Sequence, residues 1–335
     1  ATATVTVTNV LPPNAGTNGT VSLCSNAPSQ NLFGSLGGTP QAGGVWTPAL
    51  ASGSGLFNPA VDSAGVYTYT VTGTTPCPNA TATVTVTIVP KPIAGTSASL
   101  SICGNSAAQD LFPLLGNTAQ TGGVWTPALA SGTGFYNPIV DPAGVYTYTV
   151  TGTPPCANAT ATVTVTKVLP PNAGTNGTLT LCSNAPAQNL FGSLVGTPQI
   201  GGVWTPALAS GSGLFNPAVD VAGVYTYTVT GTAPCLNATA TVTVTIVPRP
   251  IAGNNSSFTL CQNSNPQDLF LLLGPTAQTG GVWTPSLASG SGVFNPTIDV
   301  AGNYSYTVTG VSPCSTATAT VNVEVKPIPD AGIDA

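Results

Sequence analysis

The sequence predicts an all-β chain: a tandem array of four β-sandwich repeats, each with one short helical turn and one disulfide. The first observation is that the stretch from Asp62 to Gly73 returns almost unchanged at 141–152, 220–231 and 299–310, always 79 positions later. The second is that Tyr67, Tyr69 and Val71 alternate with threonines in this stretch. This period of two is typical of a strand with one buried and one exposed face.

The repeat divides the 335 residues into consecutive segments. Residues 1–8 match the closing strand of a preceding repeat, and residues 325–335 match the start of a following repeat, so we expect a window of a longer array. Between them, we predict one repeat in each of four ranges: 9–87, 88–166, 167–245 and 246–324.

The copies alternate, because the first resembles the third and the second resembles the fourth. One hypothesis is that unlike neighbours exchange strands less often during folding. Duplication of a block of two repeats explains the alternation equally well.

The elements of the first repeat follow one order: a proline-rich connector (9–16), a strand (20–24), a helical turn (30–36), a strand with its tryptophan (43–48), an apolar stretch (54–59), the tyrosine strand, a turn ending at Cys77, and a closing strand (80–88). Proline stiffens the connector, so neighbouring repeats should move little against each other. Six or seven short strands separated by turn signals at short, regular intervals are typical of a β-sandwich.

Composition excludes several function classes. Only 4% of the residues are charged, with four Lys or Arg, nine Asp or Glu and no His. The chain therefore nearly lacks the side chains of acid–base and zinc chemistry. Its net charge of −5 is spread thinly and offers no basic surface to nucleic acid or membrane. No apolar run is long enough to span a bilayer. We expect a non-catalytic, extracellular chain without cofactors, metals, nucleic-acid partners or direct membrane insertion.

The eight cysteines supply one pair per repeat: Cys24 and Cys77, Cys103 and Cys156, Cys182 and Cys235, Cys261 and Cys314. Pairing within repeats uses all eight cysteines. Pairing across the junctions, such as Cys77 with Cys103, would leave Cys24 and Cys314 without a partner in this sequence. We therefore predict four structural disulfides within repeats, each contributing about 4 kcal/mol. Zinc or redox sites are disfavoured because the chain has no C-x-x-C motif and no His. Disulfides imply an oxidising compartment.

Aromatic residues recur once per repeat at two positions. The tryptophans are either sugar-stacking platforms or core residues, and the core interpretation is favoured because each lies between the two cysteines in sequence, as in a sandwich core. The first tyrosine of each tyrosine strand is also predicted in the core. The core aromatics are Trp46, Trp125, Trp204, Trp283, Tyr67, Tyr146, Tyr225 and Tyr304.

An aspartate recurs at the head of each tyrosine strand: Asp62, Asp141, Asp220 and Asp299. One aspartate with one asparagine four residues earlier is too few oxygen ligands for calcium. The favoured interpretation is that the aspartate caps a turn.

The threonine-rich faces carry almost no charge, which leaves edge strands poorly protected against pairing with other chains. We expect either glycans to shield these faces or the faces to meet in a bundle. Five asparagines lie in Asn-x-Thr sequons that matter only if the host modifies them: Asn18, Asn79, Asn158, Asn176 and Asn237.

Two resemblances add to this interpretation. The run Asp62-x-Ala64-Gly65-x-Tyr67-x-Tyr69 resembles the entry to strand F of immunoglobulin domains, with Tyr67 in the place of the tyrosine corner and Tyr69 in that of the second cysteine. The Gly-Gly-Val-Trp-Thr-Pro and Ala-Thr-Ala-Thr-Val-Thr-Val-Thr motifs, with the tyrosine strand, resemble the immunoglobulin-like or PKD-like repeats of giant Bacteroidota cell-surface adhesins, including gliding-motility adhesins. That resemblance implies type IX secretion and a filament anchored at the outer membrane.

These observations favour a structural stalk or filament segment of a long secreted surface adhesin. Two alternatives remain: a subunit that polymerises by strand complementation, using a strand such as residues 1–8, and a glycan-binding module that uses the tryptophans. The expected partners are neighbouring repeats of the same chain, with lateral self-association or contact with surface glycans and a substratum.

Overall fold

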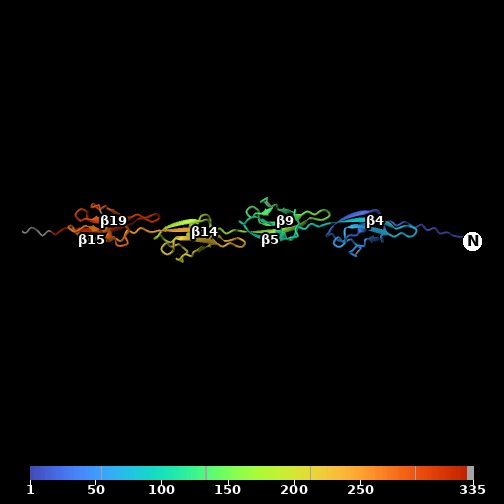
Figure 1. Ribbon diagram of the computed structural model, residues 1–335, viewed down its shortest axis with the longest axis horizontal. Helices are drawn as coiled ribbons and strands as arrows, with labels where there is room; N and C mark the ends of the chain where they lie inside the picture. Colours follow the sequence, from blue (N-terminus) through green and yellow to red (C-terminus); the bar gives the residue numbers. More distant parts are fainter. Residues whose placement is uncertain (54, 133, 212, 291, 330–335) are drawn as a thin grey trace, which may run out of the picture. The chain divides into compact units, whose positions relative to one another are not determined.

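The computed structural model describes residues 1–53, 55–132, 134–211, 213–290 and 292–329. Four four-stranded sheets follow one another along the chain, and the only helical segments in the described ranges are short 3-10 turns (Figure 1). The predicted all-β, immunoglobulin-like tandem array is confirmed. Of the predicted start of a following repeat at 325–335, residues 330–335 lie outside the described part of the chain.

The sheet of the first repeat has the strand order β1-β4-β3-β2. Its strands are β1 (Gly19–Cys24), β2 (Val45–Thr47), β3 (Gly65–Val71) and β4 (Ala80–Val89). The tyrosine strand β3 pairs antiparallel with β2 and β4, whereas β1 pairs in parallel with β4 over six residues. Strands β2, β3 and β4 correspond to strands C, F and G of an immunoglobulin domain.

The other three sheets repeat this order. Their strands are, in the second repeat, β5 (Ala98–Cys103), β7 (Val124–Thr126), β9 (Gly144–Val150) and β10 (Ala159–Val168); in the third, β11 (Gly177–Cys182), β12 (Val203–Thr205), β13 (Gly223–Val229) and β14 (Ala238–Val247); in the fourth, β15 (Ser256–Cys261), β17 (Val282–Thr284), β19 (Gly302–Val308) and β20 (Ala317–Lys326).

The layer opposite each sheet is short. In each repeat it contains one 3-10 turn: η1 (Leu32–Ser35), η2 (Phe112–Leu115), η3 (Leu190–Ser193) or η4 (Leu269–Leu273). The second repeat adds a two-stranded pair, β6 (Gln109–Asp110) with β8 (Phe135–Tyr136), and the fourth adds β16 (Gln267–Asp268) with β18 (Val293–Phe294). In the first and third repeats a single bridge replaces that pair. In the second and fourth repeats the described residues form six strands, as expected, whereas in the first and third they form four, because an isolated bridge stands in the place of the two-stranded pair.

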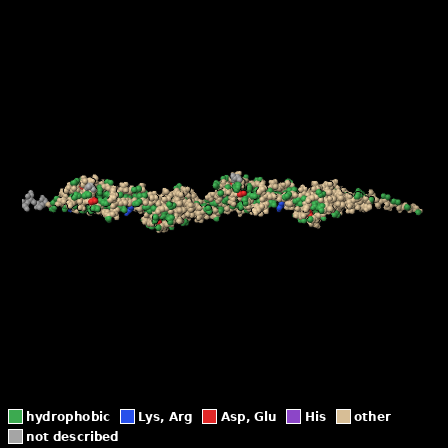
Figure 2. Space-filling model, in the orientation of Figure 1, with side chains coloured by type: hydrophobic (Ala, Val, Ile, Leu, Met, Phe, Trp, Pro, Cys, Tyr) green, Lys and Arg blue, Asp and Glu red, His purple; other side chains and the backbone are tan. Residues whose placement is uncertain are grey.

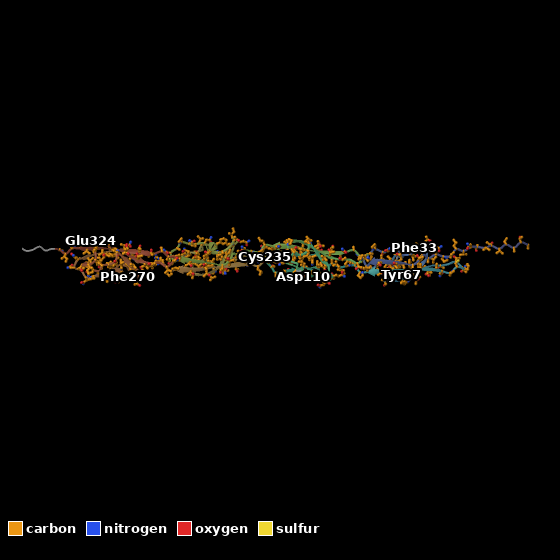
Figure 3. The ribbon with its side chains drawn as sticks, turned by 90° about the horizontal axis from the view of Figure 1, so that it is seen from above. Phe33, Tyr67, Asp110, Cys235, Phe270 and Glu324 are labelled. Carbon is orange, nitrogen blue, oxygen red and sulfur yellow. A yellow bond between two sulfur atoms is a disulfide. The ribbon has the colours of Figure 1, made fainter. Side chains whose placement is uncertain are left out.

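The core of the first repeat lies between these two layers. Tyr67, Tyr69 and Val84 point inward from the sheet, while Leu32 and Phe57 cover them from the opposite layer. All five are at least 95% buried. The adjacent threonines of β3 are on the other face, as the alternation predicts. Figure 3 labels Tyr67 among these side chains.

The described chain divides into two compact units, residues 1–169 with 233–235 and residues 170–232 with 236 onward. Each unit contains two of the four sheets. The closing strand β4 runs to Val89, two residues beyond the predicted repeat boundary. In the described ranges, no helix is long and apolar enough to cross a bilayer. Figure 2 shows a face of mostly apolar and uncharged polar side chains, with isolated charges.

Candidate functional site

The cysteine positions form the most distinctive site of the chain. The first cysteine of each repeat ends the first strand of the sheet, as Cys24 ends β1. Because β1 and β4 are parallel, Cys24 lies in register with Val89, the last residue of the closing strand. This cysteine therefore marks the end of the sheet from which the chain continues to the next repeat.

The second cysteine lies at the other end of the sheet. Cys77 belongs to the turn before β4, which is closed by a 2.8 Å hydrogen bond from Cys77 N to Thr74 O and a 3.0 Å bond from Gly73 N to Asn79 Oδ1. A Cβ atom on Gly73 would lie 2.4 Å from the carbonyl oxygen of Cys77. The turn therefore requires glycine at its first position.

The predicted pairing within repeats is wrong. Strand β4 is ten residues long, so its ends are about 30 Å apart, and Cys24 and Cys77 lie at opposite ends. A disulfide requires Cα atoms about 4.4–6.8 Å apart. No arrangement of the folded sheet brings the two cysteines of one repeat that close. The same geometry separates Cys103 from Cys156, Cys182 from Cys235, and Cys261 from Cys314.

Each disulfide instead joins one repeat to the next. The bonds are Cys24–Cys156, Cys103–Cys235 and Cys182–Cys314, each with a Cα–Cα distance of 4.9 Å and a sequence separation of 132 residues. The turn that carries the second cysteine is positioned at the end of the preceding closing strand. Cys156 Sγ lies 3.3 Å from the carbonyl oxygen of Val89, and Cys314 Sγ lies 3.4 Å from that of Val247.

Hydrogen bonds hold the connector beside the disulfide. Ser25 N donates to Val89 O at 2.8 Å, and Lys91 N donates to Ser25 Oγ at 3.0 Å. Two residues further, the backbone of Ile93 exchanges hydrogen bonds with both the side chain and the backbone of Gln120. The connector between the first two sheets is thus anchored on both sides within three residues.

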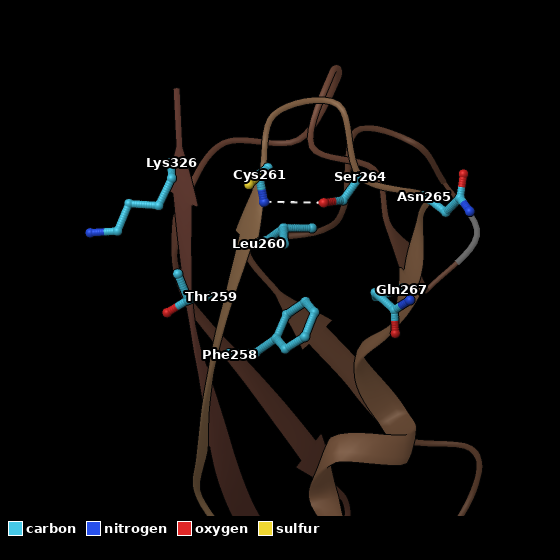
Figure 4. A pocket seen from close by; sticks show the side chains of 8 residues that line it. All are labelled: Phe258, Thr259, Leu260, Cys261, Ser264, Asn265, Gln267 and Lys326. Atoms are coloured by element: carbon cyan, nitrogen blue, oxygen red, sulfur yellow. Dashed lines mark hydrogen bonds between the residues drawn. The ribbon is translucent and has the colours of Figure 1, made fainter. Parts of the chain in front are cut away.

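Two cysteines have no disulfide partner in the described chain, the exposed Cys261 and the half-buried Cys77. Cys261 ends β15 as Cys24 ends β1, and it borders a cavity of about 490 Å³ lined by Phe258, Leu260, Gln267 and others (Figure 4). Cys77 Sγ lies 3.7 Å from Val10 O, which matches the contact of Cys156 with Val89. Cys261 therefore occupies the position of the first cysteine of a bridge between repeats, and Cys77 occupies the position of the second cysteine of such a bridge.

The predicted core aromatics occupy two environments. Tyr67, Tyr146, Tyr225 and Tyr304 are at least 95% buried. The tryptophans are half-buried and pack on the second tyrosine of the strand, with Trp46 and Tyr69 ring centroids 5.0 Å apart. Phe33 also contacts Tyr69, edge-on, with the ring centroids 5.5 Å apart. In an immunoglobulin domain the tryptophan packs on a disulfide, and here Tyr69 takes that place.

The Tyr69 hydroxyl connects the tyrosine strand to the loop before β2. It donates to Gln41 O at 2.8 Å and accepts from Gly44 N at 2.7 Å. The corresponding hydroxyl of Tyr67 donates to Ser63 O, four residues upstream, at 2.9 Å. This second bond is the geometry of a tyrosine corner, which confirms the position predicted for Tyr67.

The recurring aspartate caps a turn, as predicted. Asp62 is 97% buried, and its carboxylate accepts hydrogen bonds from Ser52 N at 2.9 Å and Asn58 N at 2.7 Å. Burial raises the pKa of this carboxyl, but hydrogen bonds from Asn58 and Ser52 outweigh burial and hold the pKa below its ordinary value of 3.8. Its oxygens therefore already have donors from the fold. In the described chain, no group of three His, Cys, Asp or Glu side chains could hold a metal ion.

The sequon asparagines also have structural partners. Asn18 Oδ1 accepts from Thr83 N at 2.8 Å, which ties the start of β1 to the closing strand. Asn79 Oδ1 accepts from Gly73 N in the cysteine turn. The equivalents of both bonds recur at Asn176, Asn158 and Asn237. These asparagines therefore have a structural role in the fold.

Comparisons with known proteins give little beyond this geometry. No protein-family model matches the chain, and no curated protein matches it. Solved structures that align with it include the insect immune protein hemolin (14% identity, 94% of this chain, 100% of that chain, TM-score 0.27). Others are a three-domain titin fragment (12%, 69% and 96%, 0.33) and the N-terminal eight immunoglobulin domains of Down syndrome cell adhesion molecule (13%, 79% and 40%, 0.36).

Proposed function

We propose that this chain is a non-catalytic stalk segment of a long, secreted cell-surface adhesin. The observation that carries the proposal is that every disulfide in the described chain joins consecutive repeats. A binding or catalytic domain needs internal stability, which bridges within repeats would supply. Bridges between repeats instead hold neighbours together, which is what a spacer requires.

The chemistry of the chain supports a structural role. The chain contains no His, and the buried aspartates are occupied by backbone donors. The disulfides favour an oxidising, extracellular location. The partners of each repeat are its neighbours along the same chain, and the uncharged threonine faces favour lateral association between copies or contact with surface glycans.

The finer assignment rests on the sequence motifs alone. The resemblance to Bacteroidota adhesin repeats supports export by type IX secretion, anchoring of the filament at the outer membrane and a role in attachment or gliding. The flanking sequence of the parent gene tests this assignment. We expect further repeats of the same period and a C-terminal sorting domain there, and their absence would contradict it.

Polymerisation by strand complementation is less well supported. Residues 1–8 are exposed and repeat the sequence of the closing strand β4. However, each of the four described sheets already contains its own closing strand: β4, β10, β14 or β20. A donated strand would have to displace one of them.

A reach assay tests the stalk function. One copy or two tandem copies of the chain would be displayed on cells, with a short streptavidin-binding peptide fused at the outer end. The cells would then be mixed with streptavidin-coated beads that carry polymer brushes of increasing thickness. We expect adhesion to need the peptide, and two copies to tolerate thicker brushes than one. Adhesion to uncoated beads or to a glycan array without the peptide would favour a binding module instead.

A further inference from the structure

We infer that the three disulfides join strands of successive repeats into two continuous covalent paths, here called threads. Because tension follows these threads and bypasses the rest of each repeat, unfolding of a repeat does not lengthen the chain. This inference goes beyond the stalk function and stands or falls independently of it, because it rests only on which cysteines are bonded.

The first thread uses one strand from each repeat. From the N-terminus it follows β1 to Cys24, crosses the disulfide to Cys156, and follows β10 and the connector into β11. At Cys182 it crosses the next disulfide to Cys314 and leaves along β20. The stretch from Cys156 to Cys182 consists almost entirely of β10, β11 and the short connector between them.

The second thread uses the remaining strand of each parallel pair. It runs from Cys77 through β4, the connector and β5 to Cys103, and then crosses to Cys235. From there it follows β14, the connector and β15 to Cys261. Both stretches are as long in sequence as the corresponding stretch of the first thread.

The two threads are paired in every repeat. The parallel pairs β1 with β4, β10 with β5, β11 with β14, and β20 with β15 each contain one strand of each thread, in register over six residues. In the second and third repeats, each strand of the pair continues covalently at both ends into a neighbouring repeat. Force carried by both threads would therefore load the paired strands of these two repeats in the same direction, without shearing their hydrogen bonds. Both ends of this chain lie on the first thread, so an end-to-end pull reaches the second thread only through the first and fourth repeats.

The larger part of the hydrophobic core of each repeat lies on a segment outside both threads, while the thread strands supply the rest, including Val163 and Val165 of β10. In the second repeat this segment lies between Cys103 and Cys156 and contains Trp125, Tyr146 and Tyr148. This segment connects the two threads but is not on the shortest covalent path between the chain ends. Its unfolding exposes the core without adding length.

The covalent path sets a numerical limit. From end to end, the shortest path contains about 70 residues and two disulfides, so the oxidised chain cannot extend beyond about 25 nm at roughly 3.5 Å per residue. The reduced chain of 335 residues can extend to about 115 nm. Disulfides within repeats would instead give about 45 nm.

The test is single-molecule stretching of the full chain between handles at its two ends, in a C77S/C261S background that prevents exchange with free thiols. For the oxidised chain, we expect extension to stop near about 25 nm even at forces that unfold the cores, and addition of a thiol reductant to release the remaining length. Oxidised molecules that extend to about 45 nm, or that lengthen in steps of a whole repeat, would overturn the inference.

Two variants with equal numbers of lost disulfides provide the matched comparison. Removing Cys24–Cys156 with C24S/C156S lengthens the shortest path to about 176 residues, so the limit should rise to about 60 nm. Removing Cys103–Cys235 with C103S/C235S leaves the shortest path unchanged, and the limit should stay at about 25 nm. Because both variants lose one bridge, a general loss of stability would affect them alike. Equal lengthening in both would contradict the threads.

Discussion

At the scale of single residues, the repeated positions are explained by hydrogen bonds and close packing. Asp62 accepts two backbone N–H groups, and Tyr67 and Tyr69 each donate to a backbone carbonyl. These bonds satisfy buried polar groups that would otherwise cost stability. The fidelity of the tyrosine strand among the copies therefore follows from the needs of the fold.

The pH dependence of stability follows from the same groups. The pKa of Asp62, Asp141, Asp220 and Asp299 is lowered, so their stabilising contribution is present above the unfolded value of 3.8 and is lost as pH falls through the lower folded value. Burial and the nearby aspartate raise the pKa of Tyr67 above 10.0, so its contribution is lost as pH rises beyond 10. Thermal unfolding followed by circular dichroism should show constant stability from about pH 5 to 9 and a decrease on both sides. A slope near pH 6.5 would contradict this, because the chain has no His.

Gly44 should not tolerate a side chain. A Cβ atom there would lie 2.6 Å from both the Tyr69 ring and the carbonyl oxygen of Thr70. We expect Gly44→Ala to destabilise the first repeat by about 1–3 kcal/mol, measured by calorimetry. Gly34→Ala is the control, because no atom lies within 4 Å of its added Cβ. Equal effects of the two substitutions would show that packing on Tyr69 is not the cause.

At the scale of elements, the parallel pairing of first and closing strands decides the cysteine chemistry. It places one cysteine at each end of the sheet, so each can be bridged only across a junction. Trypsin digestion provides a simple assay of the disulfide pairing, because trypsin should cut this chain readily only after the exposed Lys167 in β10. The other three basic residues precede proline, where trypsin cuts poorly: Lys91, Arg249 and Lys326.

Cleavage after Lys167 should give two halves that remain covalently joined. The chain would be denatured in urea with an alkylating agent, without reductant, and treated with trypsin. The bond Cys103–Cys235 connects the two halves, so they should separate on a gel only after reduction. In the C103S/C235S variant, the bond Cys24–Cys156 lies within the first half and Cys182–Cys314 within the second, so the halves should separate without reductant. Separation of the unmodified halves without reductant would support bridges within repeats.

At the scale of the whole molecule, the disulfides couple the repeats. A bridge that closes 132 residues lowers the entropy of the unfolded chain and is worth about 5 kcal/mol on the chain-entropy estimate. Without bridges, tandem repeats unfold with energies set by each repeat and its nearest neighbours.

Reduction should therefore lower both stability and cooperativity. We expect urea unfolding of the reduced chain to begin at lower concentration and to spread over a broader transition than that of the oxidised chain. The C77S/C261S variant is the control, because neither residue is bridged in the described chain, and it should unfold like the unmodified oxidised protein. A reduced chain that is as stable as the oxidised one would show that the junctions contribute little.

The sequence by itself determined the repeat, the strand pattern and the environment of the tyrosines and aspartates. Those features are local: alternation assigns Tyr67 to one face, and an aspartate beside a turn finds donors within ten residues. The half-burial of Trp46 and the small size of the layer opposite each sheet depend on how distant segments pack together in the folded repeat. The local sequence pattern contains little information about such packing.

Only the tertiary structure decided the partner of each cysteine. In an array with a period of 79, every cysteine recurs with the same neighbours, so spacing does not distinguish a partner in the same repeat from one in the next. The direction of β1 relative to β4 makes the distinction, because parallel pairing places Cys24 at the end of the sheet that faces away from Cys77. Strand direction is a property of the folded sheet, and because of it the structure has three bonds between repeats in place of the four expected bridges within repeats.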